Sequence, residues 1–210
     1  MIRHKKTERD EVMGETRARL LQAAAEVFAR RGYEGANVNV IAKSAGFSIG
    51  TMYNYFPSKR DLMDAFIDEF SQQHVDFIQE RVLAESDPAR RIESFFLTGF
   101  SFVEMHVIWS KAIFNTLNGH DEGFRQHLFQ AYLPLFQLLS QEVLSPGIER
   151  GIFQQVEPLA TANLIMLIYL GVASQFSPQG NLWLDPQQVS GFVLAALRVG
   201  GGLERKGNDE

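Results

Sequence analysis

The sequence predicts an all-α protein in which a three-helix N-terminal domain precedes a larger helical bundle. Prolines are sparse and stand between periodic segments, and the alternation of β-branched residues that is typical of strands is almost absent. With 210 residues and 45% apolar content, the chain can bury a core in one or two compact domains. We expect a flexible charged arm over residues 1–13, a first domain over residues 14–60 and a second domain over residues 61–210.

The first three helices are predicted from apolar faces and from residues that stop or start a helix. The first should end at Gly32, and it buries a face formed by Leu20, Leu21, Ala24, Val27 and Phe28. A short second helix stops at Gly46, and its apolar face consists of Val38, Ile41, Ala42 and Ala45. Ser48 can cap a third helix that runs from Ile49 to about Phe56.

The fourth helix should begin after Pro57, which cannot stand inside a helix without breaking it. Ser58, followed three positions on by Asp61, has the spacing of a capping box, and the buried face comprises Leu62, Phe66 and Phe70. Beyond residue 70 we expect long helices, interrupted near Pro88 and over residues 117–123, 145–151 and 177–186. The polar tail after Gly202 should be frayed.

Charge is divided unevenly along the chain. The net charge of −5 combines +5 in residues 1–60, from 11 basic and 6 acidic side chains, with −10 in residues 61–210, from 9 basic and 19 acidic side chains. A basic front favours a polyanionic partner at that end. The chain has no cysteine, no apolar signal segment and no run of about 18 apolar residues, so we expect a cytoplasmic protein without a membrane partner.

The stretch SAGFSIGTMYNYFPSK, residues 44–59, predicts a helix-turn-helix. In this motif the second helix lies in the DNA major groove, and its N-terminal end favours a phosphate or a base edge. Met52 and Phe56, four apart, should face the small core, whereas Asn54 can bond an adenine edge. Tyr53 and Tyr55 can present hydroxyls to phosphates, although core packing is an equally good interpretation of Tyr53.

Residues 16–62 resemble the DNA-binding segment of the TetR-type (tetracycline repressor-like) transcriptional regulators. The resemblance lies in three phrases that agree in order and spacing, AAAEVFARRGYEG, VIAKSAGFS and GTMYNYFPSKRDL. It implies a homodimer that binds a palindromic double-stranded DNA operator through its N-terminal helices. It also implies that a larger C-terminal domain dimerises through its last two helices and holds a small effector.

Particular contacts follow from the resemblance. It implies that the start of the second helix touches the DNA backbone and one base through Asn37, Val38 and Asn39. The groove would be read by Ser48, Ile49, Gly50, Thr51, Tyr53 and Asn54, and phosphates would be held by Tyr53, Tyr55 and Lys59. The sequence departs from the family pattern at three of these positions, because the family usually has threonine at Asn37, a polar or basic residue at Ile49 and frequently histidine at Tyr55.

Two groups of residues leave alternatives open, the basic residues near the N-terminus and the histidines. The basic residues Arg3–Lys6 could contact DNA as a flexible arm, or they could form a solvated tail, since the acidic ERDE segment partly cancels their charge. His106, His120 and His127 suggest a metal site, but none of them forms the i, i+4 ligand pair of helical zinc sites. We therefore expect no metal and no cofactor, and no arrangement of residues predicts an enzyme.

The C-terminal half is rich in phenylalanine over residues 95–114 and 127–139, which predicts a bundle lined by aromatic rings. Such a bundle can be filled, or it can leave a cavity for an effector. The candidate lining residues are Phe102, His106, Trp109, Phe136 and Tyr169, although core packing is the better interpretation of each residue taken singly. Residues 159–176 and 189–197 are apolar over more of their surface than one buried stripe requires, which indicates a partner.

These observations lead to one functional hypothesis and one alternative. The hypothesis is a homodimeric DNA-binding regulator, a repressor that a small, largely apolar effector releases from a palindromic operator. In the alternative, the C-terminal domain binds a protein partner rather than a small molecule.

Overall fold

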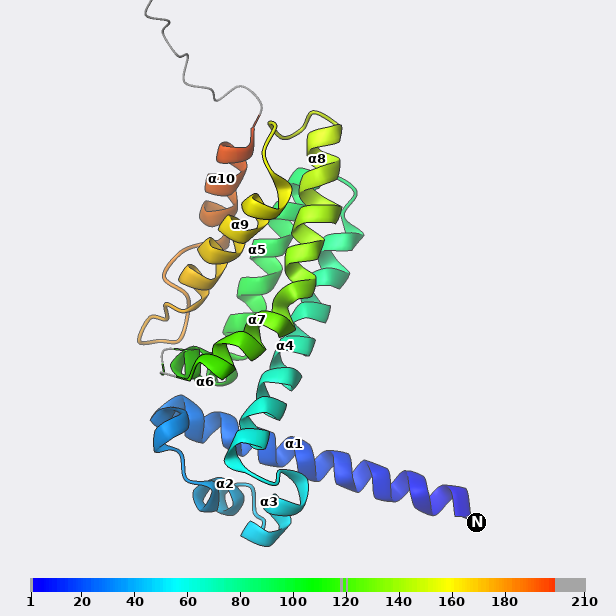
Figure 1. Cartoon of the computed structure of the whole chain (residues 1–210), viewed down its shortest axis with the longest axis vertical. Coiled ribbons are helices and arrows are strands. Elements are labelled where there is room, and N and C mark those ends of the chain that lie inside the picture. The colour runs from blue at the N-terminus through cyan, green and yellow to red at the C-terminus, as the bar shows by residue number, and fades with distance from the viewer. Residues whose placement is uncertain (1, 118, 120, 199–210) are drawn as a thin grey trace, which may run out of the picture. The chain divides into compact units, whose positions relative to one another are not determined.

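The computed structural model describes residues 2–117, 119 and 121–198, and it is helical in all its main elements (Figure 1). The expected all-α class is confirmed. The only β pairing within these residues consists of two isolated bridges, Phe153 with Arg198 and Phe176 with Leu182. In the described part of the chain, each helix is too short or too polar to cross a membrane.

The chain forms two compact units, each of which is made from two segments. The first unit comprises Met1–Gln72 and His106–Ala131, and the second comprises Gln73–Met105 and Tyr132–Glu210. Residues 14–60, the expected first domain, therefore share a unit with helices that the sequence assigned to the second domain. The reason is that α6 (Val107–Leu117) packs along α1 (Ile2–Gly35) and covers part of its apolar face.

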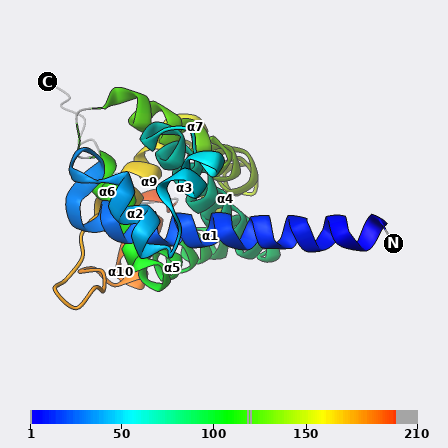
Figure 2. The same cartoon turned by 90° about the horizontal axis from the view of Figure 1, so that it is seen from below.

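Helix α1 contains a break at the glycine where the sequence predicted its end. Gly32 has φ 65° and ψ 176°, outside the helical region, and the last turn to Gly35 follows this kink. At its other end, α1 begins at Ile2, so the structure places residues 2–13 in a helix where we expected a flexible arm. Glu, Lys and Arg, which are good helix formers, dominate that segment. Figures 1 and 2 show these first turns extending beyond α2 and α3.

The helix-turn-helix is formed by α2 (Val38–Ser44) and α3 (Ile49–Tyr55). Gly46 has φ +80°, a conformation that favours glycine, and it makes the turn between the two helices. Ser48 caps α3 as predicted, because its Oγ accepts a hydrogen bond from the Thr51 backbone N at 3.0 Å. Helix α4 (Lys59–Ala84) follows with the expected cap, in which Ser58 Oγ accepts from Asp61 N at 3.1 Å.

The core of the first unit forms where α1, α3, α4 and α6 present their apolar faces. The predicted face of α1 is buried at all five positions, and Met52 of α3 and Phe56, the residue that follows α3, are 0% and 3% exposed. Phe66 of α4 stacks on Trp109 of α6, with ring centroids 4.7 Å apart. Trp109 also donates a hydrogen bond from Nε1 to Gln22 Oε1 at 2.8 Å, which ties α6 to α1.

The second unit contains the rest of α4, the end of α7 (Glu122–Gln137) and five further helical elements. These are α5 (Pro88–Met105), the π-helix η1 (Leu138–Leu144), α8 (Ser145–Glu149), α9 (Pro158–Ala173) and α10 (Pro186–Leu197). The helical path continues from α7 through η1 into α8, so the break expected over residues 145–151 occurs only at its end, at Gly151 with φ +69°. Pro134 lies inside α7, just before the widened turns of η1.

Aromatic rings fill the interior of the second unit around one polar group. Tyr169 stacks on Phe100 at 4.9 Å, and His74 stacks on Phe102 at 4.5 Å with an angle of 7° between the ring planes. His74 is 2% exposed, and its two ring nitrogens lie 2.8 Å from the Tyr132 hydroxyl and 2.9 Å from the Tyr169 hydroxyl. A neutral imidazole has one donor and one acceptor nitrogen, so one tyrosine donates to it and the other accepts.

Replacing Gly99 with alanine should destabilise the second unit by about 1–3 kcal/mol, the usual cost of overpacking a core. A Cβ atom at Gly99 would lie 2.6 Å from the Tyr169 ring and hydroxyl, so the ring would have to move and its bond to His74 would be strained. The measurement is urea unfolding followed by circular dichroism. Gly14→Ala is the control, because nothing lies within 4 Å of its Cβ position. Wild-type stability of the Gly99 variant would contradict the packing of Tyr169 on α5.

Candidate nucleic-acid interface and effector site

Helix α3 has one buried face and one face open to solvent. Met52 and Phe56 point into the core, while Ser48, Gly50, Tyr53 and Asn54 are exposed. Tyr53 is 44% exposed, which resolves its two interpretations in favour of a surface position. The remaining predicted contacts on this helix, Ile49, Thr51 and Tyr55, are half-buried. Helix α3 thus offers a small polar surface with one aromatic ring.

The start of α2 lies in the same unit and is organised by its first residue. Asn37 caps the helix, with its Oδ1 accepting a hydrogen bond from Asn39 N at 2.8 Å. Asn37 and Asn39 are exposed, and Val38 is half-buried. The helix cap therefore orients the Asn37 side chain. A threonine, which the family usually carries at this position, could cap the helix in the same way.

Lys59 is positioned differently from the expectation that it holds a phosphate. Its ammonium group donates to the backbone carbonyl oxygens of Tyr33, Glu34 and Ala36 at 2.9, 3.3 and 3.4 Å. It also lies 4.4 Å from the centre of the Tyr33 ring. An ammonium group has three donors, and the carbonyls at a helix end carry partial negative charge. All three donors are thus directed at the kinked end of α1.

Two arginines of α1 make side-chain contacts with the turn between α2 and α3 and with α4, and neither contact was predicted from the sequence. Arg19 Nη2 donates to the Ala45 carbonyl at 2.8 Å and its guanidinium lies 4.7 Å from the Phe47 ring centre. Arg17 forms an ion pair with Glu69 of α4 at 2.8 Å. Both contacts join residues that are distant in sequence, so the only local signal was a pair of basic residues beside the apolar face of α1.

The five candidate effector residues are divided between the two units. His106 and Trp109 belong to the first unit, where Trp109 is stacked on Phe66, and burial lowers the pKa of His106 below its ordinary value. Phe102, Phe136 and Tyr169 belong to the second unit, and all three are buried. Burial also raises the pKa of Tyr169, so this hydroxyl keeps its proton and remains a donor. His74 and Tyr132 are polar members of the same interior that the sequence did not indicate.

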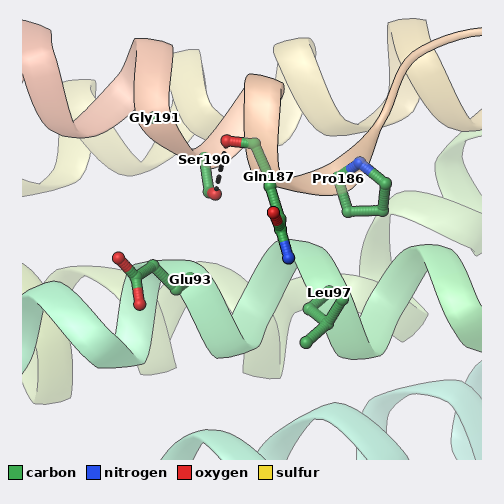
Figure 3. Close-up of a pocket in the computed structure, with 6 residues that line it drawn as sticks. All are labelled: Glu93, Leu97, Pro186, Gln187, Ser190 and Gly191. Atoms are coloured by element: carbon green, nitrogen blue, oxygen red, sulfur yellow. Dashed lines mark hydrogen bonds between the residues drawn. The ribbon is translucent and has the colours of Figure 1, made fainter.

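A groove of about 260 Å³ lies between α5 and α10 in the second unit (Figure 3). Its walls are formed by Glu93 and Leu97 of α5 and by Pro186, Gln187, Ser190 and Gly191 of α10. Ser190 Oγ donates to the Gln187 carbonyl at 3.1 Å, a bond within α10. None of the five candidate effector residues lines this groove.

A row of large apolar side chains is exposed on the last two helices and the segment that joins them. Leu159, Leu164 and Leu167 of α9 are 55%, 61% and 65% exposed, and Phe192 of α10 is 69% exposed. Trp183 and Leu184 precede α10 and are 65% and 50% exposed. Large apolar side chains exposed to this degree on two helices are typical of an interaction site.

Comparison with known proteins identifies the class of protein to which this geometry belongs. Residues 20–66 match the model of the bacterial regulatory proteins of the tetR family. The chain is 29% identical over 180 residues to the HTH-type transcriptional regulator LuxR of Vibrio harveyi, and the alignment covers 85% of each protein. It is 31% identical over 100 residues to the HTH-type transcriptional repressor KstR2 of Mycobacterium tuberculosis, which covers 46% of this chain and 50% of that protein.

The fold is also shared with a solved structure. The transcriptional regulator FadR from Bacillus subtilis, in complex with stearoyl-CoA, is 22% identical, with a TM-score of 0.75 over 87% of this chain and 98% of that one. The match of residues 20–66 covers most of the segment in which the sequence resembled the TetR-type regulators. Residues 20–66 are therefore a tetR-family segment, and the chain as a whole is similar to transcriptional regulators in sequence and in fold.

Replacing Lys59 with methionine should weaken operator binding by roughly tenfold without changing its salt dependence. The reason is that the charge ties the start of α4 to the end of α1 through three carbonyls. The measurement is operator affinity at several salt concentrations, where the loss of a phosphate contact lowers the slope of log K against log salt by about 1. Lys43→Met, at an exposed lysine of α2, measures the effect of a simple loss of charge. A reduced slope for the Lys59 variant would instead indicate that Lys59 contacts a DNA phosphate.

Proposed function

We propose that the protein is a homodimeric repressor that binds a palindromic operator through α2 and α3 and is released by a small, largely apolar effector. The observation that carries the DNA-binding part is the two-faced geometry of α3, with Met52 and Phe56 buried and Tyr53 and Asn54 exposed. A helix whose apolar face is packed on the core and whose opposite face is polar and exposed can insert into the major groove.

The exposed residues divide by chemistry into those that read bases and those that hold the backbone. Asn54 can make paired hydrogen bonds to the N6 and N7 edge of an adenine, and Ser48 and Thr51 can contact base edges or phosphates. Ile49 offers an apolar contact, which fits the methyl group of a thymine. Tyr53 and Tyr55 would hold phosphates, and the start of α2 at Asn37, Val38 and Asn39 would touch the DNA backbone and one base. Gly50 would allow close approach.

Dimerisation would use the exposed apolar surface of α9 and α10. Leu164, Leu167 and Phe192 lose their exposure to water if the same surface of a second copy covers them, and two-fold symmetry then pairs two copies of α3. Half-sites read by such a pair lie about 34–36 Å apart, or somewhat more. A palindromic operator follows from that symmetry.

The effector would enter the aromatic interior of the second unit, where Phe102, Phe136 and Tyr169 are the candidate contacts. The stearoyl-CoA in the FadR structure makes a fatty acyl thioester the first class to test. The rings favour an apolar chain, and the Tyr169 hydroxyl, which stays protonated, can donate to a carbonyl oxygen. Release requires that the effector bind the DNA-incompetent arrangement more tightly than the competent one.

Selection of bound sequences from random duplex DNA should recover a palindrome, and Asn54→Ala should lose preference at one position of each half-site. Loss of a paired contact to one base costs about 1–3 kcal/mol of discrimination. Replacing Gln126, an exposed residue of α7, with alanine serves as the control and should recover the wild-type palindrome. No enrichment with a folded protein would contradict the proposal, and an unchanged motif for the Asn54 variant would remove that residue from base reading.

Replacing both Leu164 and Leu167 with glutamate should convert the dimer into a monomer at micromolar concentration. Four charges would then be buried in the symmetric interface, which costs several kcal/mol for each ion that is not paired. Sedimentation velocity measures the change in mass, and operator affinity should fall with it. Leu83→Glu is the control, because Leu83 is 48% exposed but lies on α4. A double variant that still sediments as a dimer would place the interface elsewhere.

A further inference from the structure

His127 of α7 is held between two carboxylates of α4, all within the first unit. Its Nδ1 lies 3.0 Å from Asp64 Oδ1, and its Nε2 lies 2.6 Å from Asp68 Oδ1. Asp64 and Asp68 are one helical turn apart, so they present their carboxylates on the same face of α4. We call these three residues the His127 clamp. It joins two helices through side chains that are about 60 positions apart in sequence.

The clamp uses both ring nitrogens at once, and this requires a particular protonation state. A neutral imidazole carries one N–H, so one of its nitrogens would turn a lone pair toward a carboxylate oxygen. The imidazolium form carries two N–H groups and donates to both carboxylates through charge-assisted hydrogen bonds. Loss of the proton therefore breaks one of the two contacts and removes the charge attraction from the other.

Other charged groups lie on the elements around the clamp. Arg60 donates from Nε to Asp64 Oδ2 at 3.1 Å and from Nη1 to Asp121 Oδ2 at 2.9 Å, and its guanidinium lies 3.8 Å from the Phe124 ring centre. Asp121 also caps the start of α7, where it accepts from Gly123 N at 2.9 Å. Further groups on these elements are the phenol of Tyr33, whose pKa burial raises, the Glu122–Arg125 pair of α7 and the Arg17–Glu69 pair that joins α1 to α4.

Two opposing effects act on the protonation of His127. Partial burial lowers its pKa, but hydrogen bonds to Asp68 and Asp64 and the charges of both carboxylates together outweigh burial, so the pKa is raised above its ordinary value of 6.5. A pKa raised in the folded state stabilises the fold fully below the unfolded value, and this stabilisation is lost as pH rises through the folded pKa. The clamp is thus closed in mildly acidic solution and opens as the solution becomes alkaline.

Helices α4 and α7 are the elements whose relative position the clamp controls. Helix α4 starts four residues after α3 ends, and its first turn contains Lys59, which holds the end of α1. Both α4 and α7 run on from the first unit into the second, past residues 72 and 131. Asp68 and His127 each lie four residues before these points on the chain. A shift of α7 along α4 in the first unit would lengthen the two hydrogen bonds of the clamp.

We propose that the His127 clamp is a proton-operated lock that holds α7 on α4 and makes operator affinity depend on pH. This inference rests on the proposed function as an operator-binding regulator. The protonated clamp restricts α4, and with it the helix-turn-helix, to one arrangement, so less ordering remains to be done on binding. Operator affinity is therefore higher with the clamp closed and lower with it open.

The first test needs no DNA. An NMR titration of the histidine ring signals should give His127 a pKa above 6.5, and Asp64→Asn together with Asp68→Asn should lower it to 6.5 or below, because partial burial remains. The thermal midpoint of the wild type should fall relative to that of the double variant as pH rises through the His127 pKa. A His127 pKa at or below its ordinary value would overturn the clamp.

The second test measures operator affinity between about pH 6 and pH 8.5 at constant salt. Wild-type affinity should fall about fivefold over this range, at the lower end of typical coupling between sites. His127→Gln, which can donate to one carboxylate only, should bind at the wild-type alkaline level throughout. His127→Lys keeps a positive charge over the whole range and should not follow the wild-type decline. Gln126→Ala, the exposed neighbour on α7, should keep the wild-type profile.

The two tests separate failure of the inference from failure of the proposed function. If the wild type and His127→Gln show the same pH dependence of operator affinity, the coupling is overturned while the DNA-binding function stands. If the wild type binds no DNA sequence selectively at any pH, the proposed function is overturned and the coupling with it. The NMR titration then still decides whether the clamp itself forms.

Discussion

Burial of Met52 and Phe56 determines where the exposed polar residues of α3 lie. Helix α3 has seven residues, too few to be stable alone in water, so its existence depends on tertiary packing. Burying one large apolar side chain stabilises a fold by about 1.5–3 kcal/mol, and the two on α3 are 0% and 3% exposed. Their spacing of four leaves the opposite face to Tyr53 and Asn54. Burial alone does not fix the orientation of α3 on the core. The hydrogen bonds of Lys59 and Arg19 to backbone carbonyls restrict it further.

The second unit depends on a different principle, because one polar group organises an otherwise aromatic interior. His74, Tyr132 and Tyr169 come from α4, α7 and α9, and their two hydrogen bonds relate these helices to one another. A buried imidazole that lost either partner would retain an unpaired polar atom, which costs about 1–3 kcal/mol. Apolar rings could slide past one another at little cost, whereas these bonds are directional. The interior is therefore held in one arrangement of helices.

Local signals in the sequence predicted most of the fold. The cap at Ser48, the turn at Gly46 and the start of α4 depend only on residues a few positions apart, and all three are present. At Gly32, where the sequence predicted the end of the first helix, α1 is kinked and continues to Gly35. The exposed positions of α3 followed from helical periodicity for the same reason. Contacts between distant residues could not be predicted from one sequence. The Lys59 ammonium meets carbonyls about 25 positions away, and the His127 clamp and the Trp109 stack join elements whose proximity only the fold creates.

The two tryptophans of the chain lie in different units and in contrasting surroundings. Trp109 is stacked on Phe66 and hydrogen-bonded to Gln22 in the first unit, whereas Trp183 in the second unit is 65% exposed, next to a backbone held by Glu104. An indole against a ring emits at shorter wavelength than one in water, so the protein contains a separate optical reporter for each unit. A change in the surroundings of one unit would therefore alter a different part of the emission spectrum from a change in the other.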